Sequence, residues 1–235
     1  MNPKIKGSFS VLILLIAVLL LLMGNGYAET GDHTEPYVAS LADANVYMPL
    51  PTLRQYGDYT CGATCVQMLM NWLYPYEADL NLTQYEDALF TSPESGTSPG
   101  AILKYFDEWT VEYHAMQHIS LSRLRQALDA GHPVMLALQA WSSADDGSYN
   151  LDNPSDPETY LTEGHWVICV GYCQSAETPY FIFNDPACVG HCILSDAELE
   201  RRWIDMDGSG AIYDHFGIEI LPKTSYDGNG LFHMD

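Results

Sequence analysis

A glutamine, a cysteine and the helix expected after them form the first chemically suggestive group in the sequence. Residues 53–73 read LRQYGDYTCGATCVQMLMNWL, so Gln55 precedes Cys61 by six residues, and apolar residues then recur with helical spacing. At a helix N-terminus, free amides and the positive end of the dipole favour a thiolate over a thiol. Cys61 is therefore either a nucleophile or a structural cysteine, buried or disulfide-bonded. Gln55 is either a surface residue or a donor that completes an oxyanion hole with the Cys61 N–H.

A histidine and an aspartate at the ends of two successive apolar runs supply the other parts of such a mechanism. His165 begins the run HWVICVGYC, and Asp185 ends the run PYFIFND. If these runs pair as a hairpin, both side chains fall at one end of adjacent strands. His165 can then take a proton from Cys61, while Asp185 accepts the imidazole N–H and fixes its tautomer. Taken singly, His165 is an ordinary strand-end histidine and Asp185 begins an Asp-Pro turn, but the ordered set favours catalysis.

Four segments together resemble a known family. The segments QYGDYTCGATCVQMLMNWL, GHPVMLALQAW, GHWVICVGY and FNDPA are similar to the papain-like cysteine peptidases of the bacteriocin-processing type, cysteine peptidase family thirty-nine. The likeness runs from about residue 51 to about residue 221, and WIDMDGSGAIYDHFGIEI also resembles the C-terminal part of secreted members. The resemblance implies a thiol peptidase in which Cys61 attacks, His165 is the base, Asp185 orients it and Gln55 serves the oxyanion.

The resemblance does not fix the substrate. The best-known members are fused to ABC transporters and cut leader peptides after a double glycine, whereas this sequence carries no transporter or nucleotide-binding domain. We expect a peptide or protein substrate, no cofactor and no bound metal. Three alternatives stay open: a non-catalytic peptide-binding module on the same fold, an acyl transferase or amidase using the same triad, and a metal-binding structural protein built on the cysteine pairs.

The elements that must position these residues predict an α+β fold, and the resemblance implies that this fold is papain-like. Helices are expected from Cys61 and after the capping residues Ser98, Ser120 and Ser195. Strand-like runs follow or intervene: VEYHAMQ, PVMLALQAW, HWVICVGYC, PYFIFND and FGIEIL. We therefore expect a helical layer packed on a mainly antiparallel sheet, with the active site in the cleft between them. The irregular segment 142–164, directly before His165, is expected to overhang that cleft.

The other five cysteines are Cys65, Cys169, Cys173, Cys188 and Cys192, and with Cys61 they form three Cys-x-x-x-Cys pairs. Residues four apart on a strand lie about 13 Å apart, beyond disulfide reach, so Cys169 and Cys173 should not bond each other. A loop would allow a disulfide between Cys188 and Cys192. Cys65 lies one helical turn after Cys61 and could bond it, which would mask the site.

Two stretches resemble metal sites. The segment DMDGSGAIYDHF, residues 205–216, begins like a calcium loop, but its twelfth residue is Phe216, which argues against an EF-hand. Cys188, His191 and Cys192 have the ligand types of a zinc site. Three ligands within five residues favour a local disulfide or plain thiols instead.

The N-terminus has the three-part layout of a secretory signal. A basic start, the apolar run VLILLIAVLLLLM and the small residues GNGYA predict cleavage after Ala28, and the alternative is an uncleaved anchor. Either alternative places the domain outside the cytoplasm. The predicted organisation is a signal at 1–28, a polar leader at 29–46, a peptidase domain at 47–223 and a tail at 224–235.

The charge of the chain excludes some partners. Without Lys4 and Lys6 of the signal, 7 Lys and Arg face 31 Asp and Glu, a formal charge of −24. Such an acidic surface repels phosphate backbones and anionic headgroups, so we expect no nucleic-acid partner and membrane contact only through an uncleaved N-terminus. The sequence makes no prediction of the oligomeric state.

Overall fold

The computed structural model describes residues 40–75, 80–140, 164–188 and 190–222, all within one compact unit, Ser40–Asp235. The predicted signal, most of the predicted leader, the segment 142–163 and the tail 224–235 lie outside the described residues. Among the helices in the described ranges, none has the length and apolar character needed to cross a membrane.

The described chain alternates helices with strands. After a short 3-10 helix η1 (Leu41–Asp43), the helices are α2 (Cys61–Leu73), α3 (Leu82–Ala88), α4 (Pro99–Glu108), α5 (Leu121–Asp129) and α7 (Asp196–Arg202). The strands are β1 (Val46–Tyr47), β2 (Glu112–Met116), β3 (Val134–Gln139), β4 (Gly164–Cys173), β5 (Tyr180–Asn184), β6 (His191–Ser195), β7 (Ile204–Met206), β8 (Ile212–Asp214) and β9 (Gly217–Leu221).

Seven of the described strands form one antiparallel sheet. Its order is β2-β9-β3-β4-β5-β6, and β1 pairs with β4 beyond the end of β3. Strands β7 and β8 form a separate hairpin. The predicted α+β architecture is therefore confirmed, with the strands mainly in the second half of the chain.

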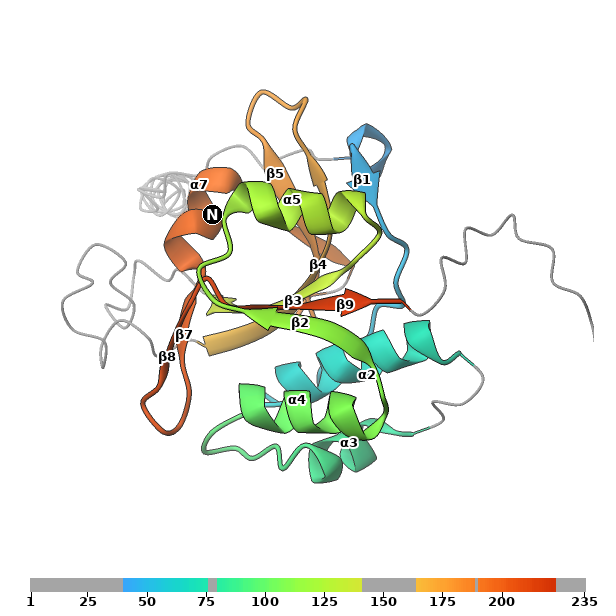
Figure 1. Ribbon diagram of the computed structural model, residues 1–235, viewed down its shortest axis with the longest axis vertical. Helices are drawn as coiled ribbons and strands as arrows, with labels where there is room; N and C mark the ends of the chain where they lie inside the picture. Colours follow the sequence, from blue (N-terminus) through green and yellow to red (C-terminus); the bar gives the residue numbers. More distant parts are fainter. Residues whose placement is uncertain (1–39, 76–79, 141–163, 189, 223–235) are drawn as a thin grey trace, which may run out of the picture. The chain divides into compact units, whose positions relative to one another are not determined.

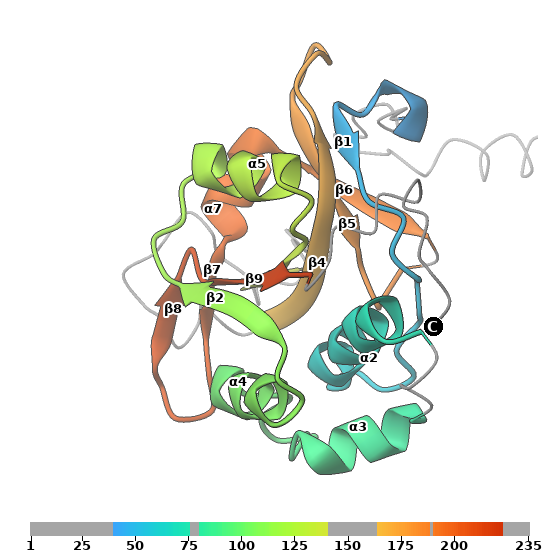
Figure 2. The same cartoon turned by 45° about the vertical axis from the view of Figure 1, so that its right-hand side comes forward.

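Helices cover both faces of the sheet, as Figures 1 and 2 show. Helices α2, α3 and α4 lie on one side, where buried residues of α2 and α4 pack against Ala137 and Ile168. Helices α5 and α7 lie on the other side and pack against Leu136 and Val167. Since both faces of β4 are covered, its sequence is an almost continuous apolar run. The expected helical layer is present, and a second helical layer opposite it was not predicted.

The stretch that begins like a calcium loop forms the β7–β8 hairpin. The carboxylate of Asp207 accepts hydrogen bonds from the backbone N–H groups of Ser209 and Ala211, which closes the turn. Aspartate commonly makes such bonds to nearby backbone in turns. The acidic pattern of this stretch therefore has a structural explanation.

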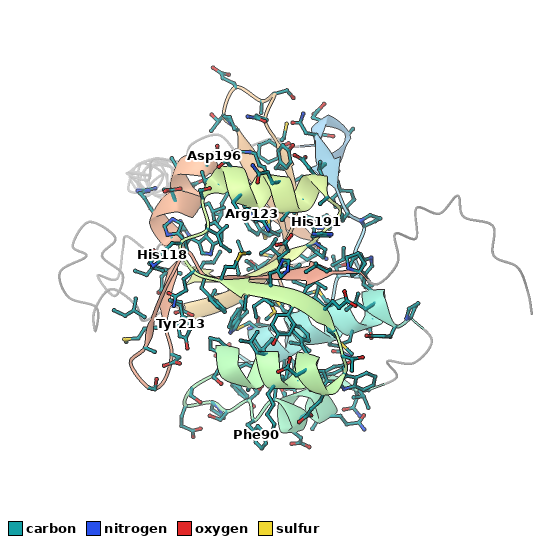
Figure 3. The ribbon with its side chains drawn as sticks, in the orientation of Figure 1. Phe90, His118, Arg123, His191, Asp196 and Tyr213 are labelled. Atoms are coloured by element: carbon teal, nitrogen blue, oxygen red, sulfur yellow. The ribbon has the colours of Figure 1, made fainter. Side chains whose placement is uncertain are left out.

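A buried carboxylate links β9 to α5. Glu219 is 3 % exposed, and it forms ion pairs with Arg123 (labelled in Figure 3) and with His132, whose Nδ1 lies 2.8 Å away. Burial alone would raise the pKa of Glu219, but the hydrogen bonds from His132 and Arg123 outweigh it and lower the pKa below its usual value. The folded state therefore favours the charged carboxylate.

Replacing Glu219 with glutamine should destabilise the protein by about 1–3 kcal/mol at pH 7, because it removes the charge that pairs with Arg123 and His132. The folded pKa is below the unfolded value of about 4.3, so this contribution is present above that pH and is lost as the pH falls. Urea unfolding should show that Glu219→Gln has a clearly lower free energy of unfolding than wild type at pH 7, and that this difference becomes smaller below about pH 4. The exposed Glu112, changed to glutamine, is the control and should show little change at either pH; equal gaps for both variants would contradict the prediction.

Candidate active site

Cys61 is the first residue of α2, and the N-terminus of this helix is uncapped. Thr60 occupies the capping position, but its hydroxyl donates to the Gly57 carbonyl at 3.1 Å and makes no capping bond. The first turn holds no acidic residue, and the Cys61 N–H has no acceptor among the described residues. The positive end of the helix is therefore left unneutralised beside the Cys61 sulfur, which is the environment that stabilises a thiolate.

His165 and Asp185 meet at one end of the β4–β5 hairpin, which the sequence predicted. The strands pair antiparallel, with Ile168 opposite Asn184. His165 Nε2 lies 2.7 Å from Asp185 Oδ1, and the two side chains are 4 % and 11 % exposed. Asp185 Oδ1 also accepts the backbone N–H of Ala187 at 2.8 Å, which holds the carboxylate in place. Because Asp185 takes Nε2, the second ring nitrogen, Nδ1, is the one left for Cys61.

The ionisation of the pair follows from these contacts. Burial alone would lower the pKa of His165, but hydrogen bonds with Asp185 and with the Cys61 sulfur outweigh it and raise the pKa to about 9. Burial would raise the pKa of Asp185, and its hydrogen bond with His165 instead holds that pKa below the usual value. At neutral pH, His165 is thus an imidazolium between the Asp185 carboxylate and the Cys61 sulfur.

Gln55 lies at the same corner of the molecule. Its backbone N–H donates to the Pro186 carbonyl at 2.8 Å, which places it beside the turn that carries Asp185. Its side-chain Nε2 donates to the Gly57 carbonyl at 2.8 Å, and its Oε1 has no partner among the described residues. The amide has one further N–H to offer. The structure therefore brings Gln55 to the site without showing a direct contact with Cys61.

All six cysteines are free thiols. Cys65 does not bond Cys61; it is buried and its sulfur donates to the Trp166 carbonyl at 3.3 Å, which ties α2 to β4. Cys169 and Cys173 are also unpaired, in agreement with the distance argument. Cys188 and Cys192 are not bridged.

The three residues with zinc-ligand chemistry, Cys188, His191 and Cys192, do not come together. His191 Nε2 lies 2.8 Å from the Tyr47 hydroxyl rather than beside the thiols. Among the described residues, Asp185, Cys188 and Cys192 are the one group with ligand atoms close enough to hold a metal, within 4.8 Å of one another. Asp185 is already bonded to His165, so we give this group no metal role.

A cavity of about 310 Å³ opens beside Cys61. It lies between the start of α2, the segment 93–97, the start of β4 and the β7–β8 hairpin, and Tyr59, Trp166 and Tyr213 line it. A second, mostly apolar cavity of about 180 Å³ lies on the side of His165 and Asp185. Of these two cavities, the first is the one whose wall includes Cys61.

Gly62 and Trp166, which the sequence analysis did not single out, fix how Cys61 sits against β4. The indole N–H of Trp166 donates to the Thr97 carbonyl at 2.9 Å. A Cβ on Gly62 would lie 2.6 Å from the Cβ of Thr97 and 2.9 Å from a ring carbon of Trp166. The Cys-Gly pair is therefore a packing requirement, and the glycine directly after Cys61 was the sequence signal for it.

Changing Gly62 to alanine should destabilise the protein by about 1–3 kcal/mol, because Thr97 and Trp166 must move to admit the methyl group. The helix start should shift with them, and a displacement of about 1 Å can slow a positioned reaction about 100-fold. The matched control is Gly100→Ala on α4, where a Cβ meets nothing within 4 Å. The free energy of unfolding in urea and the alkylation rate of Cys61 should both be lower for Gly62→Ala and unchanged for Gly100→Ala. Similar values for the two variants would refute the packing argument.

Comparison with known proteins identifies the family. Residues 47–211 match the family model described as the Peptidase_C39 like family, so the chain belongs to this family, as the four segments indicated. No curated protein matches the chain.

Solved structures share the fold. One, described as a C39-like peptidase from Bacillus anthracis, is 14 % identical with a TM-score of 0.55, and the match covers 77 % of this chain and 98 % of that one. Another, a double glycine motif protease from an AMS/PCAT transporter in complex with its leader peptide, is 16 % identical with a TM-score of 0.50, and the match covers 76 % and 96 %. At these identities the likeness confirms the papain-like C39 fold.

Proposed function

We propose that the protein is a cysteine peptidase that hydrolyses peptide bonds through Cys61, His165 and Asp185. The observation that carries this proposal is the position of His165, hydrogen-bonded both to Asp185 and to the sulfur of Cys61 at an uncapped helix N-terminus. Membership of the Peptidase_C39 like family supports it. A peptide substrate is supported by the related protease whose structure contains a leader peptide.

The proposed reaction is acyl transfer in two steps. The Cys61 thiolate attacks the carbonyl carbon, and the oxyanion forms at the N-terminus of α2, where the Cys61 N–H and the Gln55 amide donate to it. The imidazolium of His165 gives its proton to the leaving amine, and the neutral ring then takes a proton from the water that attacks the thioester. Asp185 keeps the ring oriented and stabilises its charged form throughout.

The reactivity of Cys61 tests this proposal most directly. In the purified protein, iodoacetamide should modify Cys61 quickly at neutral pH, and His165→Ala should slow the modification at least about tenfold, because the imidazolium no longer stabilises the thiolate. Peptide mapping without prior reduction gives the rate at each cysteine. The half-buried Cys188 is an internal reference, and His118→Ala, at an exposed histidine, is the matched control. Equal Cys61 rates in wild type and His165→Ala would refute the proposal.

We also propose that the protein is exported. The support is the basic, apolar and small-residue layout of residues 1–28. Intact mass spectrometry of the protein from the extracytoplasmic fraction of a secreting host should show loss of these residues. Recovery of the full-length chain in the membrane fraction would favour the anchor instead, and recovery in the cytoplasm would contradict export.

A further inference from the structure

The cavity beside Cys61 is lined by acidic side chains. Asp58, Glu94, Asp205 and Asp207 contribute to its wall, while no lysine, arginine or histidine among the described residues does. The remaining wall includes three aromatic rings, those of Tyr59, Trp166 and Tyr213. Carboxylates and aromatic faces together suit a cation on an apolar stem.

Among these acidic residues, Asp205 is the one whose contacts indicate a ligand. It lies on β7 and is mostly buried, and its Oδ1 accepts hydrogen bonds from Gln139 Nε2 at 2.9 Å and from the Met206 N–H at 2.8 Å. Its Oδ2 accepts no hydrogen bond from any described residue. Burial raises the pKa of Asp205 to about 7. The Asp205 carboxylate therefore has one oxygen without a hydrogen bond from the described residues, and the charge of the nearby His165 imidazolium offsets the effect of burial only in part.

The same carboxylate lies next to the catalytic base. A Cβ on Gly164 would lie 2.5 Å from Asp205 Oδ1 and 3.1 Å from Oδ2, so the carboxylate packs directly on the residue before His165. A group bound at Asp205 is therefore held within one residue of the base and in the cavity that contains Cys61.

Asp207 differs from Asp205 because the hairpin already uses it. Its Oδ1 accepts from the backbone and hydroxyl of Ser209 and from the Ala211 N–H, and its Oδ2 accepts the Tyr213 hydroxyl at 2.9 Å. Tyr213, labelled in Figure 3, projects from β8 of the same hairpin. Asp207 therefore stabilises the hairpin that forms one wall of the cavity. Of the two carboxylates, Asp205 is the one with an oxygen that accepts no hydrogen bond from the described residues.

Apart from the His165 imidazolium, the neighbouring sequence offers Asp205 no cation. Residues 141–163, which lead directly into Gly164, contain no lysine, arginine or histidine. A calcium ion is a poor occupant, since it takes six to eight oxygen ligands and the oxygens of Asp207 are already engaged.

We propose that Asp205 binds a lysine or arginine side chain of the substrate, so that the enzyme cleaves next to a basic residue. This inference rests on the proposed peptidase function. The stem of the basic side chain lies against the aromatic walls, and its cationic group pairs with the open oxygen of Asp205.

The test uses three irreversible acyloxymethyl ketone peptides that are identical except at the residue beside the reactive carbon, which is lysine, acetyl-lysine or norleucine. The measured quantity is the second-order rate constant for modification of Cys61 in the full protein. In the wild type, the lysine probe should react at least about tenfold faster than the other two. In Asp205→Asn this ratio should fall to near one, and in Asp87→Asn, at an exposed carboxylate outside the cavity, it should be retained.

Iodoacetamide separates the two proposals. If it modifies Cys61 rapidly but the wild type treats the three probes alike, the basic specificity is wrong and the peptidase proposal stands. A lysine preference that persists in Asp205→Asn overturns the assignment to Asp205. If Cys61 reacts with neither iodoacetamide nor any probe, the peptidase proposal fails and this inference fails with it. The wild-type comparison decides the specificity even if Asp205→Asn does not fold.

Discussion

Changing Cys61 to serine will lower peptide hydrolysis by a factor of at least about 10⁴, close to the background rate. In the proposed mechanism the sulfur of Cys61 attacks beside His165, whose pKa is raised by contacts with Asp185 and Cys61. A serine hydroxyl is far less acidic than a thiol, so the same surroundings will not hold it as an alkoxide. The measurement is turnover of a mixture of peptides, followed by mass spectrometry, with wild type and variant at equal concentration.

Cys65→Ser is the matched control for this experiment. Cys65 lies on the same helix and is fully buried, and its sulfur donates to the Trp166 carbonyl. A serine hydroxyl can donate to the same carbonyl, so the control should keep activity within a few-fold of wild type. Activity retained in Cys61→Ser and lost in Cys65→Ser would reverse the assignment of the nucleophile.

Changing Asp185 to asparagine should lower the rate by about 10³- to 10⁴-fold and shift its pH dependence. The asparagine keeps an oxygen for the Ala187 N–H but removes the charge that supports the His165 imidazolium. In the wild type, the raised pKa keeps His165 protonated up to about pH 9, so proton donation to the leaving amine should weaken only as the pH rises through that value. Without the carboxylate, the decline should move toward the ordinary histidine pKa of about 6.5.

The measurement is the pH profile of the hydrolysis rate from pH 5 to pH 10, for wild type and Asp185→Asn. Asp87→Asn, at an exposed site on α3, is the control and should follow the wild-type profile. If Asp185→Asn reduces the rate at every pH without moving the alkaline decline, Asp185 supports the local structure but does not set the ionisation of His165.

The elements that carry the site could be predicted from the sequence. Helix α2 has a strong apolar period after Cys61. The strand that begins at Gly164 and the strand that ends directly before Asp185 are nearly continuous apolar runs. The antiparallel pairing of these strands explains why His165 and Asp185 meet, because consecutive strands commonly form hairpins. The family resemblance followed from the same segments.

Other parts could not be predicted for identifiable reasons. Strand β6 contains Cys192 and follows the turn residues PACVG, so local composition favoured a loop, and only its pairing with β5 makes it a strand. The hairpin of Asp205 and Asp207 shares its Asp-x-Asp-Gly composition with calcium loops. The burial of Asp205 depends on Gln139 and Gly164, which are distant in sequence, so its role in the cavity required the structure.

The position of β4 determines when the site comes into existence. This strand pairs with β3 on one edge and β5 on the other, and near its end it also pairs with β1, so closely that a Cβ on Gly171 would lie 2.3 Å from the Val46 carbonyl. The contact between Cys65 and Trp166 closes a loop of 101 residues, and Cys61 meets His165 across the same interface. The chain must lose the entropy of closing such long loops before the contacts between their ends can stabilise it. Cys61 therefore leaves the ribosome well before His165 does, so on the proposed mechanism a growing chain holds no complete triad until β4 has entered the sheet.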